Sequence, residues 1–80
     1  MPRYYFNVHD SENIPDEDGV ELTGISEART HATQYASGLL RDEPETFWQG
    51  DEWKLEVTDD SGVTLFTLNF FVTKSPAFDS

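Results

Sequence analysis

The stretch that decides the fold lies near the C-terminus and reads WKLEVTDDSGVTLFTLNFFV (residues 53–72). In its first part Trp53, Leu55 and Val57 are separated by polar residues, and this two-residue period is typical of a strand with one buried face. The sequence DDSG (residues 59–62) is typical of a turn. The part that follows is rich in β-branched and aromatic residues. The stretch therefore predicts a β-hairpin.

The turn also predicts the register of this hairpin. If its four residues form the whole loop, Thr58 lies opposite Val63. The other cross-strand pairs then follow along both strands: Trp53 with Leu68, Leu55 with Phe66, and Val57 with Thr64.

A second pair of strands is predicted near the N-terminus. Residues 3–8 alternate between apolar side chains on one side and mixed side chains on the other. Residues 10–18 are acidic and contain a proline, and the short run VEL (residues 20–22) follows. This order predicts a hairpin with a long loop, in which Val20 and Leu22 face the core.

One helix is predicted between the two hairpins. Thr23 and Ser26 can cap its start, and Glu27 suits its first turn. We expect it to end by Arg41, because a proline follows shortly. Its apolar residues recur at helical spacing: Ile25, Ala28, Ala32, Tyr35, Ala36 and Leu39.

These elements predict a two-layer α+β domain of order ββαββ, with one helix packed on a four-stranded sheet. The strands at residues 3–8 and 63–72 have apolar residues on both faces. We therefore expect them at the centre, flanked by the other two strands, in a β-grasp-like arrangement. Residues 42–51 are expected to form an acidic loop whose aromatic residues, Phe47 and Trp48, cover an edge of the core.

Composition excludes several classes of protein. The chain has 80 residues, 5 Lys+Arg and 16 Asp+Glu, with a net charge of -11. This length allows one domain over residues 1–80, with an ordered core at 3–73 and a frayed tail at 74–80. The charge repels nucleic-acid backbones and anionic lipids, so we expect no direct binding to nucleic acid or membrane.

Because there is no cysteine, no apolar leader and no apolar run that could span a bilayer, we expect a cytoplasmic protein without disulfides.

Four motifs resemble a known family in the same order. They are MPRYYFNV (residues 1–8), PDEDGVEL (residues 15–22), EA (residues 27–28) and WKLEVTD (residues 53–59). The chain resembles a family of short uncharacterised proteins, common in alphaproteobacteria, that typically begin with an MPRYFFH-like string. The resemblance implies a domain of unknown function and no particular activity. Asn7 stands where that string has a histidine, so no role of that histidine is carried over.

Residues suited to metal binding gather in the first acidic loop, where His9, Asp10 and Glu12 lie close together in sequence. Asp16 and Asp18 leave open a weak divalent-cation site in residues 10–21, because carboxylate oxygens suit calcium or magnesium. The spacing does not match an EF-hand, since the first and last ligand positions would be isoleucines. A solvated turn is the preferred interpretation, and no metal site is predicted.

No catalytic or cofactor site is predicted either. The sequence GISEA (residues 24–28) nearly matches the G-x-S-x-G nucleophile elbow, but an alanine replaces the last glycine. His31 lies too close along the helix to act as an independently placed base. The glycines are dispersed and form no phosphate-binding loop. We therefore expect a protein that is not an enzyme and holds no cofactor.

The sheet face away from the helix is the candidate interaction surface. It mixes apolar and polar side chains, and a small chain without disulfides gains core by dimerising. We predict a protein-interaction module, a homodimer or a complex with another protein, that associates through this face. The face comprises Tyr5, Asn7, His9, Lys54, Glu56, Leu65, Asn69 and Phe71, with Thr67 among them.

Two other interpretations stay open. In one, the carboxylates of residues 10–21 and 42–52 imitate nucleic acid and inhibit a basic nucleic-acid-binding protein. In the other, the face is an ordinary half-solvated sheet surface without a partner. The dependence of binding on salt concentration distinguishes the nucleic-acid mimic from apolar association, because only contacts between exposed charges weaken steeply with ionic strength.

Overall fold

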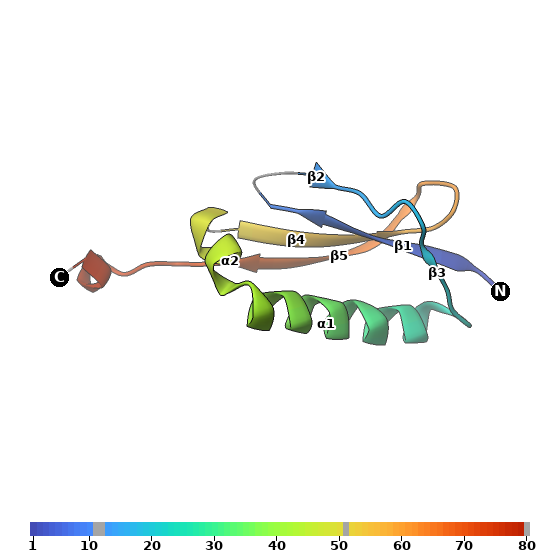
Figure 1. Ribbon diagram of the computed structural model, residues 1–80, viewed down its shortest axis with the longest axis horizontal. Coiled ribbons are helices and arrows are strands. Elements are labelled where there is room, and N and C mark those ends of the chain that lie inside the picture. Colours follow the sequence, from blue (N-terminus) through green and yellow to red (C-terminus); the bar gives the residue numbers. More distant parts are fainter. Residues whose placement is uncertain (11–12, 51, 80) are drawn as a thin grey trace.

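The computed structural model describes residues 1–10, 13–50 and 52–79. Over this part of the chain, helix α1 runs along one face of a β-sheet, and the C-terminal segment extends away from the sheet (Figure 1). The elements in chain order are β1 (Arg3–His9), β2 (Asn13–Ile14), β3 (Val20–Glu21), α1 (Ile25–Asp42), α2 (Pro44–Gly50), β4 (Glu52–Thr58), β5 (Thr64–Phe71) and the 3-10 turn η1 (Pro76–Asp79).

Within the described residues, five strands form one antiparallel sheet with the order β2-β1-β4-β5. The two short strands pair with opposite ends of β1, since β2 pairs with its end and β3 with its start. The predicted α+β class is confirmed. The predicted layout is replaced by five strands and two helices, because β2 and α2 add to the expected elements.

The predicted strand order is wrong. β1 lies beside β4, antiparallel, and β5 lies at the edge of the sheet, so the arrangement is not β-grasp-like. The prediction takes apolar residues on both faces as a sign of a central strand. Burial shows the opposite, since Leu55 and Val57 of β4 are fully buried, whereas Phe66 and Leu68 of β5 are only half-buried.

The predicted register of the C-terminal hairpin is also wrong. The Asp59 N–H donates to the Val63 carbonyl oxygen at 3.0 Å, so Asp59, and not Thr58, lies opposite Val63. A bulge follows, because Thr58 pairs with Thr64 but Val57 pairs with Phe66. The buried pairs are therefore shifted by two residues, a shift that leaves each side chain on its predicted face.

The core lies between α1 and the sheet face that it covers. Alanines at every fourth position of α1 let the helix approach the sheet closely, and Ala28 and Ala32 are fully buried. Ile25 and Tyr35, predicted in the same stripe, lie at its margins and are about half-exposed. The buried apolar residues are Tyr4, Phe6, Val8, Leu22, Ala28, Ala32, Ala36, Trp53, Leu55 and Val57.

The predicted acidic loop at residues 42–51 contains α2 instead. Pro44 begins this helix, because proline lacks the N–H that the first helical position leaves unpaired. Phe47 packs against the core, as expected. Trp48 is exposed, and its ring stacks on that of Phe78 with centroids 6.2 Å apart.

None of the helices described is both long enough and apolar enough to cross a membrane.

Candidate functional site: the open face and outer edge of the sheet

The residues predicted for the interaction face lie largely together on the sheet face opposite α1. Directly paired residues of antiparallel strands point to the same side, and the register joins Asn7 with Glu56, His9 with Lys54, and Lys54 with Asn69. Tyr5 pairs with Thr58 at one end of β4, and Phe71 pairs with Glu52 at the other. Leu65 is the extra residue of the bulge and lies apart from the others, at the outer margin of the sheet.

The middle of this open face is polar. The His9 ring nitrogens lie 2.6 Å from Asn13 Oδ1 and 3.4 Å from Glu56 Oε1. The Thr64 hydroxyl donates to Glu56 Oε2 at 2.9 Å. Lys54 Nζ lies 3.3 Å from Glu52 Oε1. These polar groups separate Tyr5 from Phe71, so the open face does not carry one continuous apolar patch.

Asn7 and Asp16 fasten the first acidic loop to β1. Asn7 Oδ1 accepts the Asp16 N–H at 2.9 Å, and its Nδ2 donates to the Glu56 carbonyl oxygen at 3.3 Å. The Asp16 carboxylate accepts the backbone N–H groups of Phe6, Asp18 and Gly19, at 3.2, 3.1 and 3.1 Å. Phe6 lies between the segment of β1 that pairs with β3 and the segment that pairs with β2. The Asp16 carboxylate therefore accepts the Phe6 N–H at a position where no neighbouring strand described on that side provides a carbonyl oxygen.

This arrangement sets the charge state of Asp16. Partial burial raises the pKa of this carboxyl group, but the hydrogen bonds from the Gly19, Phe6 and Asp18 backbone, together with the nearby His31, outweigh burial and lower the pKa overall. The carboxylate that sequence analysis considered for a weak metal site is therefore engaged by the backbone. The residues described contain no group of three or more His, Cys, Asp or Glu that could hold a metal ion, and Glu12 lies outside them.

The outer edge of β5 is the second notable surface. No other described strand pairs with this edge, and its sequence TLFTLNFF contains no charged residue and no proline. Its side chains facing α1, Phe66, Leu68 and Phe70, are half-buried. A groove of about 460 Å³ runs along this edge beside α1, where Ile25 and Arg29 line its far wall. An unpaired, uncharged strand of this length is a template for pairing with another strand.

No acidic residue belongs to the two chain segments that form this edge. No Asp or Glu occurs in residues 28–41, which make up most of α1, or in residues 61–78, which contain β5. The groove shows that these two segments lie side by side. All 16 acidic residues therefore belong to other parts of the chain. This edge is not among the surfaces predicted from the sequence, although the acid-free segments are visible there.

The chain matches one protein-family model. Residues 3–71 match the model of a domain of unknown function, DUF6894. The chain belongs to the DUF6894 family. The DUF6894 match runs from β1 to β5, so it covers both hairpins and both helices, and it confirms the predicted membership of a family of unknown function. No curated protein and no solved structure is significantly similar to the chain.

Proposed function

We propose that the protein is a small interaction module that pairs with a second copy of itself along the outer edge of β5. The observation that carries this proposal is the unpaired, uncharged and acid-free edge in a chain of net charge -11. Two copies repel each other over most of their surface, and this edge is where they approach without opposing carboxylates. Because the middle of the open face is polar, we propose the β5 edge as the contact surface in place of the open face predicted from sequence.

A twofold axis suits this contact, because an antiparallel pair of identical strands needs only one self-complementary segment. Each new backbone hydrogen bond contributes about 0.5–1.5 kcal/mol net. The half-buried Phe66, Leu68 and Phe70 of each copy become covered, and each adds roughly 1 kcal/mol of apolar burial. The two α1 helices then lie on the same face of a continuous sheet.

Charges placed on β5 test this contact. In an antiparallel pair centred on β5, Thr67 faces either itself or Asn69 of the second copy, so residues 67 of the two copies lie within reach of long side chains. Thr67→Glu and Thr67→Lys should each give monomers, and an equimolar mixture should restore the dimer. Ser61→Glu, in the exposed hairpin loop, is the matched control and should leave the dimer intact.

Sedimentation equilibrium gives the readout, over roughly 1 µM to 1 mM, which covers Kd values worth about -8 to -4 kcal/mol. Lys54→Glu tests the open face, where this residue lies between His9 and Asn69. A dimer abolished by Lys54→Glu and retained by both Thr67 variants would place the contact on the open face. A monomeric wild-type chain throughout this range would refute self-association.

The acidic mimic stands as a second proposed function, because the confinement of the acidic residues leaves a strongly negative remainder of the surface. Its partner would be a basic nucleic-acid-binding protein. Such a complex should weaken steeply as salt rises, whereas pairing along the uncharged β5 edge should change little. Neither proposal includes catalysis.

A further inference from the structure

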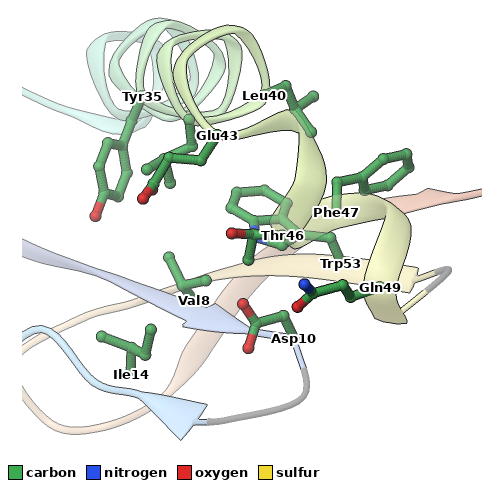
Figure 2. Close-up of a pocket in the computed structure, with 11 residues that line it drawn as sticks. Val8, Asp10, Ile14, Tyr35, Leu40, Glu43, Thr46, Phe47, Gln49 and Trp53 are labelled. Carbon is green, nitrogen blue, oxygen red and sulfur yellow. The ribbon is translucent and has the colours of Figure 1, made fainter.

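A hollow of about 360 Å³ lies at the corner where α1 meets α2. Figure 2 shows side chains from the helical corner above it and from β1 and β2 below it. Its volume falls in the range of sites that hold small organic molecules. No residue of β5 lines it, so it is separate from the proposed edge contact.

Aromatic side chains form much of the wall. Trp53, only 3% exposed, lies against the core, and the half-buried Phe47 comes from α2. Tyr35 projects from α1 and keeps 41% of its surface exposed. Aromatic faces attract cations electrostatically, most strongly where water is partly excluded.

Every charge that lines this hollow is negative. Asp10 follows β1, and Glu43 is the C-cap residue that follows α1. Figure 2 shows their carboxylates on opposite sides of the space, with Val8 and Thr46 between them in this view. Among the residues that the structure describes, none of those lining the hollow is Lys, Arg or His. The carbonyl end of an 18-residue helix adds partial negative charge at the same corner.

We propose that this hollow binds a small organic cation, an amine or quaternary ammonium group with a short apolar body. The apolar body lies against Trp53 and Phe47, and the ammonium group lies between the carboxylates of Asp10 and Glu43. Anions are rejected by the same two carboxylates. This binding goes beyond the proposed self-association and does not depend on it.

The test uses three probes of one shape: phenethylamine, its neutral isostere 2-phenylethanol, and anionic 3-phenylpropanoate. Each is titrated into the full-length protein while the indole N–H signals are followed by NMR. Trp53 lines the hollow and Trp48 does not, so Trp48 is the internal reference. The expected result is a saturable shift of the Trp53 signal with the amine and none with the anion.

Charge-removing variants locate the ammonium group. Glu43→Gln and Asp10→Asn should each weaken amine binding about threefold to fivefold, the upper part of the range for one exposed charge pair. Glu45→Gln removes the same charge from α2 outside the hollow and should leave binding within about twofold. If Asp10→Asn does not fold, the comparison of Glu43→Gln with Glu45→Gln tests the role of charge by itself.

Three outcomes overturn the proposal. The first is no saturable shift of Trp53 with phenethylamine. The second is equal binding of 2-phenylethanol, which would make the hollow an apolar site without a role for charge. The third is an equal loss in Glu43→Gln and Glu45→Gln, which would mean that the amine follows the overall charge of the chain.

Discussion

Removal of the Asp16 carboxylate should destabilise the fold far more than its half-exposed loop position indicates. In Asp16→Ala, the Phe6 N–H loses its acceptor at a part-buried position between the two segments of β1 that pair with short strands. An unsatisfied, partly buried donor costs about 1–3 kcal/mol. The contact with the Asp18 N–H is exposed and adds little, whereas the contact with the Gly19 N–H is part-buried and adds to the loss.

The predicted loss in Asp16→Ala is therefore about 2 kcal/mol. For a domain of this size, each kcal/mol lowers Tm by roughly 4–8 °C, so Tm should fall by roughly 8–16 °C. Asp18→Ala removes the same charge from the same loop and should cost less than about 0.5 kcal/mol, because the structure uses the backbone of Asp18 and not its side chain. Asp16→Asn keeps one carbonyl acceptor and should lie between Asp16→Ala and wild type.

The effect should depend on pH with a definite sign. The pKa of Asp16 is lower in the folded state than its ordinary value of 3.8, so ionised Asp16 stabilises the fold above that value. This contribution is lost as pH falls through the folded pKa. Urea unfolding of wild type and Asp16→Ala should therefore give a large difference at neutral pH that narrows under strongly acidic conditions. Equal stability of Asp16→Ala and Asp18→Ala at neutral pH, or a difference that widens in acid, would refute this reasoning.

Two further predictions concern close packing. Gly19→Ala should cost more than about 2 kcal/mol, because φ is +72 and a Cβ would lie 2.8 Å from the Tyr5 ring, whereas Gly62→Ala, at φ +84 with open space around it, should cost about 1 kcal/mol. Urea midpoints check the pair, and equal losses would contradict the predicted clash. Ala32→Leu should destabilise by about 1–3 kcal/mol by forcing α1 away from the sheet, while Ser37→Leu on the exposed side of α1 should stay within about 0.5 kcal/mol. Thermal unfolding measures both, and a neutral Ala32→Leu would show that the helix does not pack as closely as described.

Elements with a strong local period could be predicted from the sequence. Alternation at Tyr4, Phe6 and Val8 predicts β1 with the correct buried face, and helical spacing of alanines predicts α1. Alternation in residues 53–57 predicts β4 in the same way. In each case the signal lies within one element and does not depend on its neighbours.

Features that depend on neighbours could not be predicted. Apolar residues on both faces of β5 are compatible with two positions in the sheet: a central strand, or an edge strand that pairs with another molecule. The pattern therefore does not determine the strand order. The bulge at Leu65 depends on how Asp59 closes the hairpin loop, through its carboxylate contacts with the N–H groups of Ser61 and Val63. The contact between Asp16 and Phe6 joins a loop to a strand that precedes it, and no local period marks it.

One part of the candidate site, the open face, could be predicted from the sequence, and the other part, the β5 edge, could not. Membership of the open face follows from strand period alone for the paired residues, and a register shift of two residues leaves it unchanged. Leu65 is the exception, because the bulge removes it from the pairing. The edge needs the strand order, which the sequence does not contain, although the absence of Asp and Glu from residues 28–41 and 61–78 is a signal of it.

The most direct test of the proposed edge contact is an isotope-filtered NOE measurement between two copies. One sample of the protein is labelled with nitrogen-15 and the other with carbon-13, and the two are mixed. Pairing along β5 predicts intermolecular NOEs that join Thr67 of one copy to Thr67 or Asn69 of the other. Intermolecular NOEs between His9 or Lys54 and the second copy, with none from β5, would contradict the account and assign the contact to the open face.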